Sequence, residues 1–280
     1  MIVKVLIAGG ILGAIGFVLG AALWFAAKTF HVEQDDRIDK ITACLPGANC
    51  GGCGYAGCAG YAAAMVNDGA KLDLCGVCDS EGVSKISEIL GVEAVSHERK
   101  TAFVRCRGGN EVANKKYVYH GMADCIAEAR LLDGHMSCKY GCIGFGTCTT
   151  ACKYDAIHIV DGIAKVDREK CVGCMACAKV CPRDLIVPVD YNHYTVIACA
   201  SKARGATTIR GCSSGCIGCG QCVKACPYDA IRVEDNLAII DYSKCTSCGL
   251  CAIICPQQMI ASPVKTTPEL SQLVKAALKK

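Results

Sequence analysis

The chain has 280 residues, of which 26 are cysteine, and a formal net charge of +4 when every cysteine is counted as neutral. Many of the cysteines are only two residues apart, and such neighbours cannot form disulfides with each other without strain. The composition therefore argues against a disulfide-stapled secreted domain. Thiolates bound to metal would also make the charge balance negative, so a basic nucleic-acid-binding protein is not indicated.

Residues 1–28 are predicted to form a membrane anchor. The segment Val5 to Ala27 contains no charged residue and is flanked on each side by one lysine. A helix rises about 1.5 Å per residue, so this segment is long enough to cross a bilayer core of about 30 Å. A cleaved signal peptide fits less well, because the segment ends in Trp24-Phe25 and not in small residues.

Four glycines of this segment share one helix face because they are three or four residues apart: Gly9, Gly13, Gly16 and Gly20. Small residues at this spacing let a second helix approach closely, which favours a partner within a membrane complex. The alternative is that glycine is simply common in membrane helices.

Residues 29–95 are predicted to form a small domain around one [4Fe-4S] cluster, with the ligand spacing Cys50-x2-Cys53-x4-Cys58-x16-Cys75. Glycines surround the first three cysteines, as expected where backbone must approach a cluster closely. One helix is predicted from Ala59 to about Val66. A second is predicted from Gly82 to Leu90, with Gly91 as its C-cap.

Three later runs match the bacterial ferredoxin signature, in which three cysteines two residues apart are followed by a fourth and a proline. The runs are Cys171, Cys174, Cys177 and Cys181; Cys216, Cys219, Cys222 and Cys226; and Cys245, Cys248, Cys251 and Cys255. A tight loop can wrap three thiolates around a cluster, and the proline turns the fourth towards a neighbouring cluster. Structural zinc sites instead use cysteine pairs separated by a dozen or more residues. Iron–sulfur clusters also need a reducing compartment, which places these domains in the cytoplasm.

An internal repeat relates two ferredoxin modules, predicted at residues 96–190 and 191–262. Residues 141–186 align without a gap on residues 215–260, at an offset of 74. Each copy is predicted to contain short helical turns after its cysteine loops and one β-hairpin between them. The predicted hairpins join Ile157–Val160 to Ile163–Val166, and Ile231–Val233 to Leu237–Ile240 through a turn at Glu234-Asp235-Asn236. The expected fold class is α+β: an N-terminal transmembrane helix, a small four-iron domain and two tandem 2[4Fe-4S] ferredoxin modules.

The first module departs from its copy at two positions. Phe145 stands where the second module has Cys219, and Lys153 stands where it has Pro227. The motif becomes Cys138-x3-Cys142-x5-Cys148-x3-Cys152. Either Cys138 supplies the missing ligand or the site holds a three-iron centre, and the prediction favours Cys138 because it lies only four residues before Cys142.

The order of these parts resembles a known family. A hydrophobic anchor, a C-x2-C-x4-C-x16-C domain opened by Leu45-Pro46-Gly47, and ferredoxin motifs are similar to the B subunit of the Rnf ion-translocating oxidoreductases. The chain looks closest to the long variant of anaerobes, which carries two ferredoxin modules. The resemblance covers nearly the whole chain, although Ala56 stands where the family usually has proline. Corrinoid iron–sulfur proteins share the four-iron domain, so the combination of parts carries the resemblance.

The resemblance implies a single-pass subunit in the cell membrane with its cluster domains on the cytoplasmic side. It would accept electrons from soluble ferredoxin and pass them to the other membrane subunits, in a complex that couples electron transfer between ferredoxin and NAD to Na⁺ or H⁺ translocation. No nucleotide-binding motif and no nucleophile–base pair is visible, so the chain is expected to bind no NAD itself. The alternatives are a polyferredoxin subunit of another membrane complex, such as a hydrogenase, and a reductive activator of a corrinoid protein.

Five [4Fe-4S] clusters are expected, with ligands exchanged between runs by analogy with two-cluster ferredoxins. The predicted sets are Cys50, Cys53, Cys58 and Cys75; Cys152, Cys171, Cys174 and Cys177; Cys138, Cys142, Cys148 and Cys181; Cys216, Cys219, Cys222 and Cys255; and Cys226, Cys245, Cys248 and Cys251. A sixth cluster could use Cys106, Cys125, Cys199 and Cys212, and the alternative is that these are buried free thiols. Cys44 and Cys78 are expected to bind nothing, and residues 263–280 to form a tail helix capped by Thr267.

Overall fold

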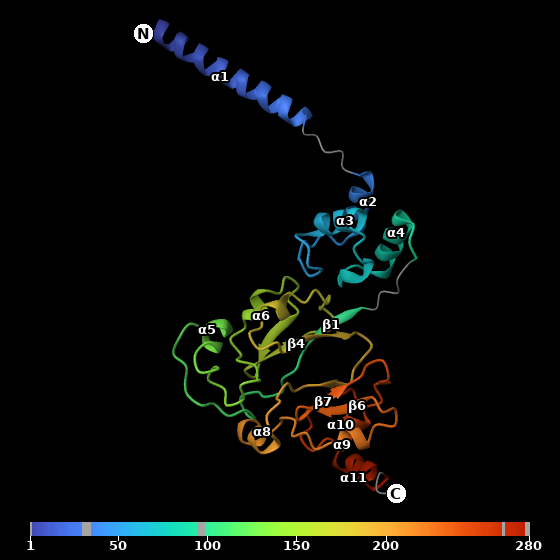
Figure 1. The fold of residues 1–280 in the computed structure, drawn as a ribbon. Coiled ribbons are helices and arrows are strands. Elements are labelled where there is room, and N and C mark those ends of the chain that lie inside the picture. The colour runs from blue at the N-terminus through green and yellow to red at the C-terminus, as the bar shows by residue number, and fades with distance from the viewer. Residues whose placement is uncertain (1, 30–34, 94–98, 265–266, 278–280) are drawn as a thin grey trace.

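The computed structural model describes residues 2–29, 35–93, 99–264 and 267–277. The first element, α1 (Ile2–Thr29), is one continuous helix, which confirms the helix expected there (Figure 1). Over the described residues, no helix meets the combined length and apolar character of a membrane span. The expected transmembrane helix is therefore not identified.

The N-terminal domain contains α2 (Asp36–Cys44), α3 (Cys58–Asn67), the short 3₁₀ helix η1 (Leu72–Leu74) and α4 (Ser80–Leu90). The cap of α4 follows from its sequence, because Asp79 accepts a hydrogen bond from Gly82 N and Gly91 is left-handed, with φ +67°. The helices predicted from Ala59 and from Gly82 are thus confirmed within two residues at their N-termini. Helix α2 was not predicted from the sequence.

The first ferredoxin module contains β1 (Lys100–Val104), α5 (Cys125–Ala129), α6 (Thr147–Thr150), β2 (Ile157–Val160), β3 (Ile163–Val166), α7 (Ala176–Lys179) and β4 (Ile186–Asp190). The predicted hairpin is confirmed, since β2 and β3 pair through Asp161 and Gly162, both of positive φ. A second, unpredicted pair joins β1 to β4, which are more than 80 residues apart in the sequence.

The second module repeats this arrangement with β5 (Val196–Ile197), α8 (Gly205–Gly211), α9 (Gln221–Lys224), β6 (Ile231–Glu234), β7 (Leu237–Ile240), α10 (Leu250–Ile254) and β8 (Ile260–Ala261). The β6–β7 turn is tighter than predicted, because Glu234 pairs with Leu237 and only Asp235 and Asn236 form the turn. The last helix, α11 (Pro268–Ala277), begins where Thr267 Oγ1 accepts a hydrogen bond from Leu270 N, as predicted.

Strand pairing shows that the two modules match at two different offsets. Val104 of β1 lies opposite Ile186, and Ile197 of β5 lies opposite Ile260. Because Ile186 and Ile260 are equivalent at the offset of 74, Val104 and Ile197 are equivalent as well, at an offset of 93. The first module therefore has extra residues between β1 and its first cysteine loop, and these include α5.

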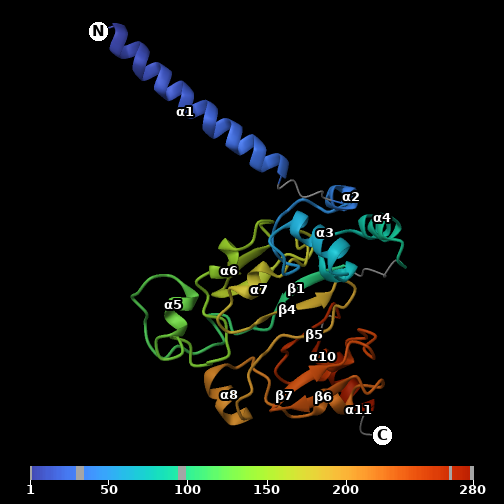
Figure 2. The same cartoon turned by 45° about the horizontal axis from the view of Figure 1, so that its top comes forward.

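The N-terminal domain packs against the first module, and the second module lies on the other side of the first (Figures 1 and 2). Lys179 Nζ donates to Gly51 O at 2.7 Å across the first of these contacts. Glycine is required at this contact, because a Cβ on Gly52 would lie 2.5 Å from Cys174 O. The cysteine loop of the N-terminal domain is thus close to the loop before α7.

Candidate functional site

The four predicted ligands of the N-terminal domain line one cavity: Cys50, Cys53, Cys58 and Cys75. The loop before α3 is held by Asn49 Oδ1, which accepts a hydrogen bond from Cys58 N at 2.9 Å. Gly57 has φ +119°, and a Cβ there would collide with Asn49. Burial raises the pKa of Cys75, and nearby Cys53 and Cys58 raise it further. Cys174 of the first module also lines this cavity.

Cys152 packs against the buried core that contains Cys171 and Cys177. Burial raises the pKa of Cys177 to about 12, and the neighbouring thiols Cys171, Cys174 and Cys152 contribute to the shift. Backbone N–H groups point at sulfur, since Ala102 N donates to Cys171 Sγ at 3.3 Å and Ala156 N to Cys152 Sγ at 3.5 Å. Hydrogen bonds to sulfur are one of the means by which proteins tune iron–sulfur clusters.

The third cysteine group differs from the prediction in one member. Its cavity is lined by Cys125, Cys142, Cys148 and Cys181, and not by Cys138. Cys125 begins α5, where its N–H donates to Thr147 Oγ1 at 2.9 Å. Burial is the main cause that raises the pKa of Cys148 to about 12, and the thiols of Cys142, Cys125 and Cys181 raise it as well. The structure thus places Cys125 in the same cavity as Cys142, Cys148 and Cys181.

Phe145, which stands in the sequence where the second module has Cys219, does not line this cavity. Its ring lies 5.6 Å from that of Tyr119 and 5.8 Å from that of His135, measured between centroids. The residue that replaces Cys219 of the second module therefore belongs to an aromatic cluster and has no ligand role.

The second module contains two further groups of cysteines. One cavity is lined by Cys216, Cys219, Cys222 and Cys255. Burial raises the pKa of Cys251 to about 12, with Cys222, Cys245 and Cys248 adding to it. Cys226 Sγ accepts from Ala230 N at 3.4 Å, which repeats the contact of Cys152 with Ala156.

A further cavity lies between the two modules. It is lined by Cys106, Cys138, Cys199 and Cys212. It is similar in size to the cavities at Cys142 and Cys216. The sequence pattern favoured Cys125 in this group and Cys138 in the third, whereas the structure places them the other way round. Cys44 and Cys78 pack in the hydrophobic core of the N-terminal domain.

The cysteines are suited to hold iron–sulfur clusters. None of the 26 cysteines forms a disulfide. Within the part of the chain that the structure describes, no three His, Cys, Asp or Glu side chains surround a point where a single metal ion could bind. The thiols instead line cavities, and burial makes their thiolates costly unless a bound cation compensates. Soft sulfur donors of this kind are typical ligands of iron–sulfur clusters.

Family models confirm the class of protein. A model for an Fe-S cluster domain matches residues 45–77, a 4Fe-4S binding domain matches residues 164–187, and a 4Fe-4S dicluster domain matches residues 215–259. The chain is therefore an iron–sulfur protein whose cofactors are [4Fe-4S] clusters, organised as a four-iron domain followed by ferredoxin modules.

Curated relatives place the chain within one family. It is 42% identical over 245 residues to the B subunit of the Na(+)-translocating ferredoxin:NAD(+) oxidoreductase complex of Acetobacterium woodii, covering 87% of this chain and 74% of the relative. It is 41% identical to the B subunit of the ion-translocating oxidoreductase complex of Methanosarcina acetivorans, covering 84% and 89%. A proton-translocating counterpart from Clostridium ljungdahlii is 36% identical, covering 82% and 81%. The chain belongs to the B-subunit family of the ion-translocating oxidoreductase complexes.

Proposed function

We propose that this chain carries electrons from reduced soluble ferredoxin to the membrane subunits of an ion-translocating ferredoxin:NAD oxidoreductase. The observation that carries the proposal is the contact between successive cysteine groups. Cys174 lines the N-terminal cavity, Cys148 and Cys177 pack in one buried core, and Cys222 and Cys251 pack in another. The family supports the same role, because the relatives are named as subunits of such complexes.

Cavities and neighbouring thiols support five ligand sets, and Cys226 is assigned by its equivalence to Cys152. We assign Cys50, Cys53, Cys58 and Cys75 to the first; Cys152, Cys171, Cys174 and Cys177 to the second; Cys125, Cys142, Cys148 and Cys181 to the third; Cys216, Cys219, Cys222 and Cys255 to the fourth; and Cys226, Cys245, Cys248 and Cys251 to the fifth. Each set has four thiols, so the third is assigned a four-iron and not a three-iron centre. When bound, such clusters supply one-electron uptake and release. The protein supplies the ligands, the N–H donors to sulfur and the close spacing of the sites.

Rapid mixing tests the electron-transfer role. Reduced ferredoxin mixed anaerobically with the full-length chain should bleach its cluster absorption, whereas NADH alone should not, because the sequence shows no nucleotide-binding motif. A variant without the first site, Cys53→Ala/Cys58→Ala, should be reduced at least an order of magnitude more slowly. The matched control Cys44→Ala, in a cysteine outside the cavity, should behave as the native chain does. Direct reduction by NADH with no response to ferredoxin would overturn the proposal.

We further propose that α1 anchors the chain in the membrane, next to a helix that another member of the complex supplies. Val5 to Ala27 carries no charge, and large apolar side chains are exposed along α1, among them Phe17 at 78% and Val18 at 64%. Gly13 and Gly16 have open space around them, since a Cβ on either would meet no atom within 4 Å. The family supports a membrane-associated complex, with the cluster domains proposed to lie on the cytoplasmic side.

Substitutions on the glycine face test the helix contact. Gly13→Leu or Gly16→Leu should leave the chain in the membrane fraction but reduce its co-purification with the other subunits, because the bulky side chain blocks close helix approach. Ala14→Leu, which lies on a different face of α1, is the control. Unchanged co-purification of the glycine variants would rule the helix contact out.

A further inference from the structure

The cavity between the modules collects four cysteines that lie far apart in the sequence. Cys106 follows β1, Cys199 follows β5, Cys212 ends α8, and Cys138 lies in the loop after α5. Cys199 and Cys212 are 9% and 8% exposed, so their thiols face the interior. We propose that these four cysteines hold a sixth [4Fe-4S] cluster that bridges the two ferredoxin modules, a site that rests on the electron-transfer function proposed above.

The four cysteines form two pairs of equivalent residues, and each pair has one member from each module. Cys142 N donates to Cys106 Sγ at 3.4 Å, and Cys216 N donates to Cys199 Sγ at 3.3 Å. Cys142 and Cys216 are equivalent at the offset of 74, so Cys106 and Cys199 occupy equivalent places. This agrees with the β1–β4 and β5–β8 pairings, which relate them at the offset of 93.

Cys138 and Cys212 form the other equivalent pair. Each closes the same turn, in which Gly141 N donates to Cys138 O at 3.1 Å and Gly215 N donates to Cys212 O at 3.3 Å. The modules thus meet with their corresponding thiols facing one cavity. Free thiols buried only as small hydrophobic groups have no reason to occur as two repeat-related pairs around the same space.

Close backbone approach and N–H donors make the cavity suitable for a cluster. A Cβ on Gly108 would lie 3.3 Å from Cys212 Sγ and 3.6 Å from Cys106 Sγ, so a larger residue would crowd the sulfurs. Ser201 N donates to Cys199 Sγ at 3.4 Å, in addition to Cys216 N. Hydrogen bonds to ligand sulfur and closely approaching glycine backbone are features of iron–sulfur sites.

The position of the site joins two otherwise separate groups. The N–H donors to Cys106 and Cys199 belong to Cys142 and Cys216, which are assigned to the third and fourth clusters. The bridging site therefore contacts one ligand residue of each module. With it, every cysteine group from the N-terminal domain to the second module has a neighbour in contact.

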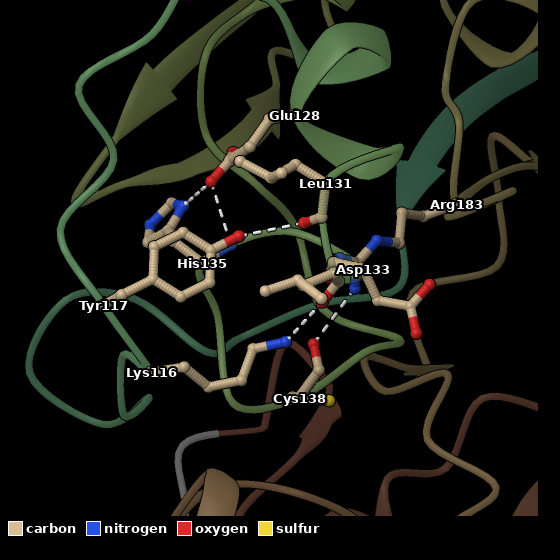
Figure 3. A network of polar contacts seen from close by, with 9 residues as sticks. Lys116, Tyr117, Glu128, Leu131, Asp133, His135, Cys138 and Arg183 are labelled. Atoms are coloured by element: carbon tan, nitrogen blue, oxygen red, sulfur yellow. Dashed lines mark hydrogen bonds and ion pairs between the residues drawn. The ribbon is translucent and has the colours of Figure 1, made fainter.

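A polar network holds the segment that leads to Cys138 (Figure 3), and Cys138 lines this cavity and not the third one. Arg183, two residues after Cys181, donates to Cys138 O at 3.0 Å and also to Asp133 O. Nearby, Tyr117 Oη donates to Leu131 O at 2.9 Å. The fully buried Glu128 accepts from the backbone N–H of His135 at 2.9 Å. These contacts fix the backbone conformation of the segment from α5 to Cys138.

Metal analysis tests the site on the full-length chain, purified and reconstituted under anaerobic conditions. The native chain should contain about 24 irons and as many sulfides, four of each per cluster. The variant Cys106→Ala/Cys212→Ala, which removes one ligand from each module, should contain about 20 of each. The control Cys78→Ala, in a buried cysteine outside the cavities, should retain about 24.

Iron anomalous scattering from crystals of the native chain provides a second measurement that needs no variant. A sixth iron peak between Cys106, Cys138, Cys199 and Cys212 is expected. A native chain that saturates near 20 irons would overturn the bridging cluster, as would one zinc per chain that the double variant loses. Such a chain could still be reduced by ferredoxin, in which case only the sixth site fails. Conversely, 24 irons without reduction by ferredoxin would overturn the proposed function and leave the site standing.

Discussion

The two ferredoxin modules have equivalent strand pairs and hairpin turns, but a different set of cysteines lines the cavity at Cys142 and the cavity at Cys216. In the second module, the cavity is lined by the local run Cys216-x2-Cys219-x2-Cys222 and by one distant cysteine, Cys255. In the first module, Phe145 stands where the second module has Cys219, and the cavity is completed by Cys125, which lies 17 residues before Cys142 on a separate helix. A cavity lined by four cysteines is thus kept, although one of the four comes from a distant part of the chain.

The same comparison explains the bridging cavity. The segment between β1 and Cys142 is longer than the equivalent segment between β5 and Cys216. It contains both Cys125 and Cys138. Cys125 compensates for Phe145 within the first module, which leaves Cys138 in the position equivalent to Cys212 at the interface. The departure of one module from the motif therefore leaves the pairing between modules intact.

The largest expected effect is the loss and rescue of the third cluster. Cys125→Ala should remove the fourth ligand, so the site should lose iron or convert to a three-iron centre. The double variant Phe145→Cys/Cys125→Ala restores the second-module pattern and should recover the four-iron site. Iron content and electron paramagnetic resonance of the oxidised protein would measure both outcomes.

Cys138→Ala is the matched comparison, because sequence proximity favours Cys138 as the ligand of the same site. Any three-iron signal of the Cys138→Ala variant should persist when Phe145→Cys is added. Rescue of Cys138→Ala by Phe145→Cys, with none for Cys125→Ala, would show that Cys138 is the ligand of the third site.

The next effect concerns equivalent core residues. Leu185 and Met259 are each 1% exposed and correspond at the offset of 74. Leu185→Ala and Met259→Ala should each cost about 2–5 kcal/mol, through lost burial and the cavity left behind. Cluster loss makes unfolding irreversible, so the measurement is the rate at which cluster absorption decays on anaerobic heating.

Leu132, which is 75% exposed, provides the control. Leu132→Ala should change stability by less than about 0.5 kcal/mol. Fast decay of cluster absorption in only one of the two core variants would show that Leu185 and Met259 do not have equivalent packing roles in their modules.

A smaller effect is expected at Arg183, whose counterpart in the second module is Gln257. Arg183→Gln removes the hydrogen bonds to Cys138 O and Asp133 O and should cost about 1 kcal/mol, since the side chain is only partly buried. Iron release to a chelator should accelerate from the bridging site. Gln257→Ala should leave that rate unchanged, and equal acceleration by both variants would argue against a specific role for Arg183.

The smallest effect concerns the two hairpin turns. Gly162, with φ +72°, corresponds to Asn236, with φ +61°. Gly162→Asn should cost about 1 kcal/mol, because a Cβ there would lie 2.7 Å from the side chain of Asn110. Asn236→Gly should stay within about 0.5 kcal/mol, because any relief of the left-handed backbone is offset by the lost hydrogen bond from its amide to Lys202 O. Thermal decay of the clusters would rank the two.

Local chemistry is what the sequence by itself determined. The triplets of cysteines, the hairpin at Asp161-Gly162, the C-cap at Gly91 and the N-cap at Thr267 all depend on residues within a few positions of one another. Their conformations are set by short-range sterics and hydrogen bonds, so spacing alone predicts them. The family resemblance rests on the same local motifs and was confirmed by the relatives.

Only the tertiary structure decided which distant cysteines meet. Sequence proximity favoured Cys138 over Cys125 for the third site, and the offset of 74, extended upstream of residue 141, would pair Cys125 with Cys199. The β1–β4 and β5–β8 pairings instead make Cys106 the counterpart of Cys199, each two residues after its strand's last paired residue, Val104 and Ile197. The course of the segment after α5 depends on Arg183 and Glu128, which act over up to 50 residues of sequence. Such contacts form only once the chain has folded, so spacing along the sequence carries no signal for them.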